Sequence, residues 1–252
     1  MRAKNVLIVG PPRSGTSMTA RVFANLGYFV ALTDDELRPE DRYNRSGYWE
    51  SERLVEANVQ VLRAAGFPHH NTWLYERLPS AIASRIGDVE PLQAHRDLVA
   101  SYEARGPWLW KDPRLCFTLP YWWPLLPQDR TGVLLVTRNT EHVFQSFVRL
   151  SWRDNTVADR AETIARIESH IDAAERAVRE LRIPNVAVTY TELEQDPGSV
   201  ALRLNEAFGV DLCAADIGFV SRRDHNHDRM RGRFVGRLER TLATLSHVIS
   251  GR

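Results

Sequence analysis

Five short apolar runs punctuate the chain, and none of them alternates with polar residues. They lie at residues 6–9, 28–32, 108–110, 132–137 and 186–190. Uninterrupted apolar runs of this length are typical of strands that are buried on both faces of a parallel sheet. The pattern therefore predicts about five parallel strands.

Segments with apolar residues at helical spacing separate these strands. The expected helices cover residues 15–26, 51–65, 90–103, 140–150, 157–181, 197–208 and 238–249. Gly27, Gly66 and Gly209 follow three of them, at the position where glycine commonly ends a helix. Strands that alternate with helices indicate an α/β fold in which helices cover both faces of the sheet. We expect a single domain over residues 1–252, because no linker or repeat divides the chain.

The turn after the first strand has the composition of a phosphate-binding loop. Residues 6–18 read VLIVGPPRSGTSM, a buried strand, a loop framed by Gly10 and Gly15, and the start of a helix. Backbone N–H groups and the helix dipole attract an anion at such a turn, and glycine lets the ligand come close. The spacing is that of a P-loop, but Thr16 stands where the nucleotidase lysine would follow.

This turn predicts a P-loop-type three-layer fold, with a central parallel sheet of about five strands flanked by helices. The missing lysine points away from ordinary ATP or GTP chemistry. The residues expected to bind the phosphorylated ligand are Arg13, Ser14, Gly15, Thr16 and Ser17.

Composition excludes several other classes of protein. The net charge of +1 gives no reason to expect nucleic acid or an anionic membrane as a partner. No apolar stretch approaches the ~18 residues of a membrane span, and the first run is too short for a signal peptide. Cys116 and Cys213 fit no metal-ligand or redox spacing. We therefore expect reduced thiols, a cytoplasmic location and no bound metal.

Two further sites at the ends of predicted strands carry chemistry. The strand at 132–137 delivers Arg138 to the carboxyl edge of the sheet, and the helix after it carries Ser146; together they could hold one anionic group from two sides. Alternatively, Arg138 pairs with a carboxylate and Ser146 faces solvent. Lys111 follows the strand at 108–110, and only Lys4 is another lysine among 33 basic residues. Because a compact ammonium and a planar guanidinium are not interchangeable, Lys111 is a candidate catalytic residue, with chance retention as the alternative.

These motifs together resemble the sulfotransferase family, which transfers a sulfuryl group from 3′-phosphoadenosine 5′-phosphosulfate (PAPS). The run PPRSGTS resembles the family's loop for the 5′-phosphosulfate, and Arg138 and Ser146 stand eight apart as in its 3′-phosphate motif. Tyr190 with Asp196-Pro197 matches a family pattern whose tyrosine lies near the adenine. Lys111 falls where cytosolic members carry the lysine that meets the sulfuryl group. The resemblance implies PAPS as donor, no metal, and a hydroxyl of a small-molecule or carbohydrate acceptor.

The chain departs from cytosolic members of that family in two places. Pro113 occupies the position of their catalytic histidine, two residues after the lysine. Only Arg231-Gly232 resembles their C-terminal Arg-Lys-Gly motif, and the match is partial. The general base is therefore expected to be a carboxylate.

Three carboxylates compete for that role. Asp34 stands where members lacking the histidine use a glutamate after the second strand, although it could be a solvated turn residue. Glu50 closes the motif NRSGYWE, or else caps the helix that follows. Asp112 adjoins Lys111, either as the base or as its ion-pair partner.

Other functions and partners stay open at this point. A P-loop phosphotransferase would need a lysine after Gly15 and a magnesium-holding carboxylate, and a non-catalytic relative would keep only the nucleotide pocket. The oligomeric state, a homodimer included, is not determined. Several aromatic residues could line an acceptor pocket, although core packing is the favoured interpretation. They are Trp73, Tyr75, Trp108, Trp110, Tyr121, Trp122 and Trp123.

Overall fold

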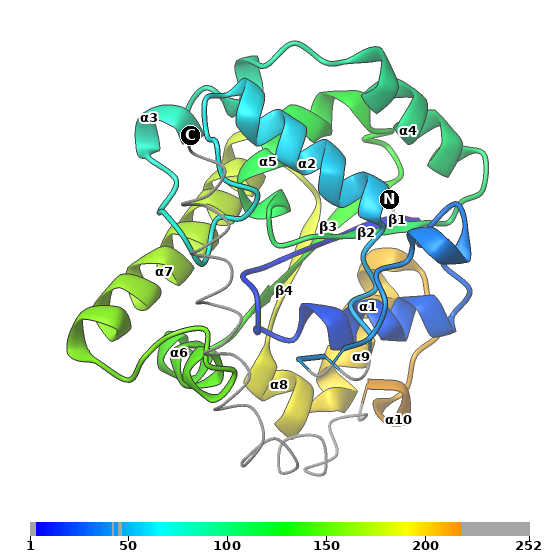
Figure 1. The fold of residues 1–252 in the computed structure, drawn as a ribbon. Helices are drawn as coiled ribbons and strands as arrows, with labels where there is room; N and C mark the ends of the chain where they lie inside the picture. The colour runs from blue at the N-terminus through cyan, green and yellow to red at the C-terminus, as the bar shows by residue number, and fades with distance from the viewer. Residues whose placement is uncertain (1–3, 42, 45–46, 218–252) are drawn as a thin grey trace.

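The computed structural model describes residues 4–41, 43–44 and 47–217 (Figure 1). Its centre is a parallel sheet in the order β2-β1-β3-β4. The strands are β1 (Asn5–Val9), β2 (Leu109–Lys111), β3 (Thr131–Thr137) and β4 (Asn185–Thr189). Because all four strands run the same way, their carboxyl ends meet at one edge, where open α/β sheets bind ligands.

Helices cover both faces of this sheet. One layer contains α2 (Glu52–Ala64), α4 (Gln93–Glu103), α5 (Leu115–Trp122) and α7 (Val157–Glu180), and the other contains α1 (Thr16–Asn25), α8 (Tyr190–Gln195), α9 (Pro197–Phe208) and α10 (Ala214–Ile217) (Figure 1). Alternate strand residues enter the two cores: Leu7 and Val9 pack in one, Val6 and Ile8 in the other. The predicted three-layer α/β fold is confirmed.

The prediction of a strand at residues 28–32 is wrong, so the sheet has four strands. Only Phe29 makes a bridge to the edge of the sheet, with Trp108. The carbonyl oxygen of the next residue, Val30, accepts a hydrogen bond from the hydroxyl of Tyr102 at 2.6 Å. Phe29 makes both backbone bonds toward β2, so the Val30 carbonyl bonds to α4 on the side away from β2, and the pairing is limited to Phe29.

Most of the predicted helices form within one or two residues of their expected bounds, α6 (Thr140–Arg149) among them. The helix expected from residue 90 begins at Gln93, since a residue before proline avoids helical backbone and Pro91 follows residue 90. The spacing of apolar residues did not predict α5, because this helix is apolar on nearly every side and contains Pro120. The helix expected at 238–249 lies outside the described residues.

Most of the aromatic residues belong to the core. Trp108, Trp110 and Trp122 are almost completely buried and pack edge to face or tilted against one another and Tyr102. Trp73 is only partly buried. In the described part of the chain, every helix is too short or too polar to cross a bilayer.

Candidate active site

Two glycines set the shape of the loop between β1 and α1. A Cβ on Gly10 would lie 2.1 Å from the carbonyl oxygen of Val136 on β3, so only glycine fits beside that strand. Gly15 begins α1 in the left-handed region, with φ +101°, and a Cβ there would lie 2.8 Å from the ring of Tyr190. The hydroxyl of Ser14 donates to the carbonyl of Pro11 at 2.6 Å and fixes the turn. The first N–H groups of α1, with no partner inside the helix, are left at the carboxyl edge of the sheet.

Arg13 joins this loop to α6. Its Nε donates to Ser146 Oγ at 3.1 Å and its Nη1 to the carbonyl of Tyr43 at 2.9 Å. The residue is in the left-handed region, with φ +68°, a conformation that non-glycine residues adopt mainly where the surroundings hold them. Burial lowers the pKa of the Arg13 guanidinium, and the positive charge of Arg138 acts in the same direction. A site that disfavours its own cations in this way is suited to an anion.

Arg138 lies at the same place, just after β3. Its Nη1 donates to the carbonyl of Arg13 at 3.3 Å, and its guanidinium lies 4.0 Å from the centre of the Tyr190 ring. Its Nε is buried and has no hydrogen-bond partner among the described residues. Buried polar groups are nearly always satisfied, so this nitrogen is a donor that an anionic ligand could satisfy. The structure therefore brings together Arg13, Arg138, Ser146 and Tyr190, which come from three separate segments of the chain.

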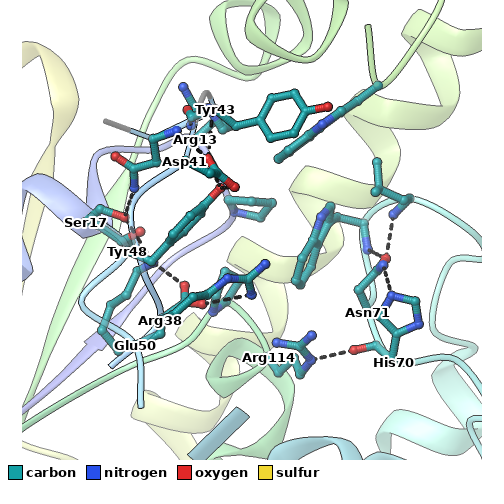
Figure 2. Close-up of a pocket in the computed structure, with 18 residues that line it drawn as sticks. Arg13, Ser17, Arg38, Asp41, Tyr43, Tyr48, Glu50, His70, Asn71 and Arg114 are labelled. Atoms are coloured by element: carbon teal, nitrogen blue, oxygen red, sulfur yellow. Dashed lines mark hydrogen bonds and ion pairs between the residues drawn. The ribbon is translucent and has the colours of Figure 1, made fainter. Parts of the chain in front are cut away.

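Lys111 ends β2 next to the loop. Its ammonium forms an ion pair with Glu50 Oε1 and donates to Ser17 Oγ at 3.1 Å. Lys111 and Glu50 are 3% and 4% exposed. The second carboxylate oxygen of Glu50 meets Arg38 Nη1 at 3.4 Å (Figure 2). Buried charges persist only when they are paired, so Glu50 and Lys111 hold each other in position.

The segment before Glu50 approaches the loop closely. Asn44 Nδ2 donates to Ser17 Oγ at 3.1 Å and to the carbonyl of Gly47 at 2.7 Å. Trp49 is in the left-handed region, with φ +56°, which is unusual for a bulky residue. Strained backbone of this kind concentrates at functional sites. Glu50 is not a helix cap, because Ser51 occupies that position before α2.

Arg13, Arg38 and Glu50 line a cleft of about 270 Å³, drawn in Figure 2, whereas Arg138, Ser146 and Tyr190 lie outside its lining. Thr16, Ser17 and Lys111 form part of its lining, and several of the other lining residues are apolar or aromatic. The apolar and aromatic residues of the lining are Pro12, Tyr43, Tyr48, Trp73, Leu74, Pro113 and Trp152. The cleft thus offers cations and a carboxylate beside a surface that suits an organic ligand.

The structure does not bring the other two candidate bases to this cleft. Asp112 is 1% exposed; Oδ1 accepts from the N–H and Nη1 of Arg114 at 2.9 and 2.8 Å, and Oδ2 accepts from Asn58 Nδ2 at 2.9 Å. Its ion-pair partner is Arg114, not Lys111. Asp34 is exposed in a short 3-10 turn and is not among the residues that line the cleft.

Sequence reasoning did not find Arg38, Tyr43 or Asn44. Arg38 is one of many arginines, and nothing in its neighbourhood distinguishes it. Asn44 belongs to the NRSGYWE motif, which drew attention only through its aromatic residues and Glu50. Within the described residues, no three histidine, cysteine, aspartate or glutamate side chains gather as metal ligands would.

The fold is that of an α/β protein with a cation-lined cleft beside the loop that follows its first strand. A family model described as "Sulfotransferase family" matches residues 5–214. The chain therefore belongs to the sulfotransferase family, which is a family of group-transferring enzymes.

Solved structures similar to this one are also sulfotransferases. The sulfotransferase domain from the Synechococcus PCC 7002 olefin synthase is 19% identical with a TM-score of 0.48, over 88% of this chain and 80% of that one. The domain from the curacin biosynthetic pathway is 17% identical with a TM-score of 0.49, over the same shares. Sulfotransferase STF9 from Mycobacterium avium is 15% identical with a TM-score of 0.48, over 86% and 67%. No curated protein sequence matched the chain.

Proposed function

We propose that this chain is a PAPS-dependent sulfotransferase that moves a sulfuryl group to a hydroxyl of a small-molecule or carbohydrate acceptor. The observation that carries the proposal is the contact between Arg13 and Ser146, which unites the glycine-framed loop with the segment after β3. A ligand with phosphate groups at two positions would be bound from both sides there. Ordinary nucleoside diphosphates and triphosphates lack the second position, the 3′-phosphate.

The residues present fit such a donor. We assign its 5′-phosphosulfate to the P-loop formed by Arg13, Ser14, Gly15, Thr16 and Ser17, where backbone N–H groups and a helix N-terminus favour an anion. We assign its 3′-phosphate to Arg138 and Ser146, and its adenine to the neighbourhood of Tyr190. The unpartnered Nε of Arg138 supports this, because a phosphate oxygen would accept its hydrogen bond.

Glu50 is the proposed general base. When bound, the donor supplies the sulfuryl group, whose sulfur gains a bond to the acceptor oxygen and loses its bond to the 5′-phosphate oxygen. Glu50 accepts the proton of the acceptor hydroxyl, a contribution of typically ~10²–10⁴ in rate. Asp34 and Asp112 are weaker candidates, since neither lines the cleft.

Lys111 has a linked role in this proposal. While Glu50 is ionised, the ammonium of Lys111 is paired with it and with Ser17. When Glu50 takes up a proton, it loses its negative charge and no longer neutralises Lys111. The ammonium of Lys111 can then stabilise the negative charge that develops on the leaving oxygen. Arg13 and the loop N–H groups stabilise the same charge, and one such contact is typically worth ~10²–10³ in rate.

A thermal-shift comparison tests the donor assignment. Adenosine 3′,5′-bisphosphate at about 100 times its Kd should stabilise the fold by ~2.7 kcal/mol. ADP and ATP at the same concentrations should stabilise it less, since they cannot reach Arg138 and Ser146 with a phosphate. Equal stabilisation by all three would refute the 3′-phosphate assignment, and magnesium-dependent ATP turnover would favour a phosphotransferase. Bisphosphate binding without sulfate transfer to a broad acceptor panel would favour a non-catalytic relative.

A further inference from the structure

A second cavity adjoins the proposed active site. It has a volume of about 460 Å³ and is lined by Val55 and Val59 of α2 among other residues. Four residues line both this cavity and the cleft with Glu50 and Lys111: Arg38, Asp41, His70 and Arg114. These four residues therefore lie at the junction of the two cavities.

Arg114 is the buried cation at this junction. Its side chain is 4% exposed, its Nη1 is paired with Asp112, and its Nε donates to the carbonyl of His70 at 2.6 Å (Figure 2). Its remaining nitrogen, Nη2, makes no hydrogen bond to any described residue, although the side chain lines both cavities. A guanidinium held by two of its nitrogens presents the third in a fixed direction, where a carboxylate can accept a charge-assisted hydrogen bond from it.

The carboxylates near this nitrogen already have hydrogen-bond or ion-pair partners. Arg38 lies at the same junction, with its Nη1 3.4 Å from Glu50. The carboxylate of Asp41 is also there, but its oxygens accept from the hydroxyl of Tyr48 at 2.9 and 2.8 Å and from the N–H groups of Tyr43 and Asn44. Glu52 lines only the second cavity and lies 4.0 Å from Arg38.

Trp73 supplies an apolar surface beside the same cation. The Arg114 guanidinium lies 5.0 Å from the centre of the Trp73 ring, and Trp73 lines the cleft. We propose that the acceptor is a hydroxy acid, with its hydroxyl at Glu50, its apolar body against Trp73 and its carboxylate on Arg114. This proposal rests on the proposed function, because it requires an acceptor hydroxyl to bind beside Glu50.

Acid and amide versions of the same acceptor test the proposal. The probes are 4-hydroxybenzoate, 4-hydroxyphenylacetate and 3-(4-hydroxyphenyl)propionate, each against its primary amide, titrated calorimetrically into the full chain saturated with adenosine 3′,5′-bisphosphate. At least one acid should bind about tenfold or more tightly than its amide, the usual size of a charge-assisted hydrogen bond. No preference for any acid in the wild-type protein would overturn the proposal.

Variants test whether Arg114 causes the preference for the acid over the amide. Arg114→Gln should abolish it, and Arg114→Lys should keep only part of it, since the charge remains without the planar fork. Arg179→Gln, an exposed residue on α7, removes the same charge elsewhere and should leave the preference intact. An unchanged preference in both Arg114 variants would refute the assignment, provided that the bisphosphate still stabilises them.

If Arg114→Gln fails to fold, the comparison of acid and amide binding in the wild-type protein still tests the proposal. Failure of the proposed function would give a different result. In that case ADP would stabilise the protein as well as the bisphosphate does, whatever the acids do.

Discussion

Replacing Glu50 with glutamine removes the proposed proton acceptor and leaves the shape of the side chain nearly unchanged. In the structure, the two oxygens of Glu50 face Lys111 and Arg38, and Glu50 is 4% exposed. Turnover should fall by ~10²–10⁴, the contribution of a positioned base. That loss corresponds to about 2.7–5.5 kcal/mol of barrier, at ~1.36 kcal/mol for each factor of ten.

Stability should fall in the same variant, because Lys111 stays buried without its anion. Removing one partner of a buried ion pair typically costs about 3–5 kcal/mol. For a domain of this size that predicts a Tm lower by about 6–20 °C. Bound bisphosphate gives Lys111 a new anionic neighbour, so it should narrow the difference in unfolding free energy between the variant and the wild type by no more than about 0.7 kcal/mol.

The assay combines single-turnover sulfate transfer from PAPS with thermal shift and bisphosphate titration. Bisphosphate affinity should stay within about threefold of wild type, a change of ~0.7 kcal/mol. Glu175→Gln, an exposed residue on α7, is the matched control and should change none of these quantities. The Asp34→Asn variant tests the alternative general base, and it should retain most of the transfer activity. Full activity of Glu50→Gln would refute the assignment of the base.

Three other predictions follow from the same geometry. Arg138→Ala or Ser146→Ala should weaken bisphosphate binding by about 10–100-fold and leave ADP binding unchanged in calorimetry; equal losses for both ligands would contradict the 3′-phosphate assignment. Gly15→Ala should lower the free energy of unfolding by about 1–3 kcal/mol in urea and abolish bisphosphate binding, since its φ is +101° and the new Cβ would meet Tyr190. Burial lowers the pKa of His170 from 6.5 to about 4, so the neutral form is favoured by the folded state. Stability should therefore be complete above pH 6.5 and fall by up to about 3 kcal/mol toward pH 4, and His170→Gln should flatten that dependence.

The sequence predicted most of the sheet, and the physical reason is simple. A strand buried on both faces must be apolar throughout, and β1, β2 and β3 were found by that property. The run that became β4 was also expected to be buried, but β4 lies at the edge of the sheet and three of its five residues are exposed. Residues 28–32 have the same composition, but only Phe29 pairs with the sheet, and the Val30 carbonyl bonds to Tyr102 on the other side. Composition cannot show which partner a backbone group will find.

The candidate site was predicted in part for a similar reason. Carboxyl ends of parallel strands meet at one edge, so the proximity of Arg13 and Arg138 followed from topology. The pairing of Glu50 with Lys111 depends on the path of a long loop, 61 residues away in the chain, and no local pattern encodes it. Adjacency in sequence suggested Asp112, but neighbouring residues of an extended segment point to opposite sides, and Asp112 pairs with Arg114.

Calorimetric titration of the wild-type chain with adenosine 3′,5′-bisphosphate and with ADP tests the central claim most directly. The two ligands share the adenosine and differ in where the second phosphate sits. Recognition by Arg138 and Ser146 predicts that the bisphosphate binds at least about tenfold more tightly, the difference expected for charge-assisted contacts to one phosphate. Equal affinities would contradict the account.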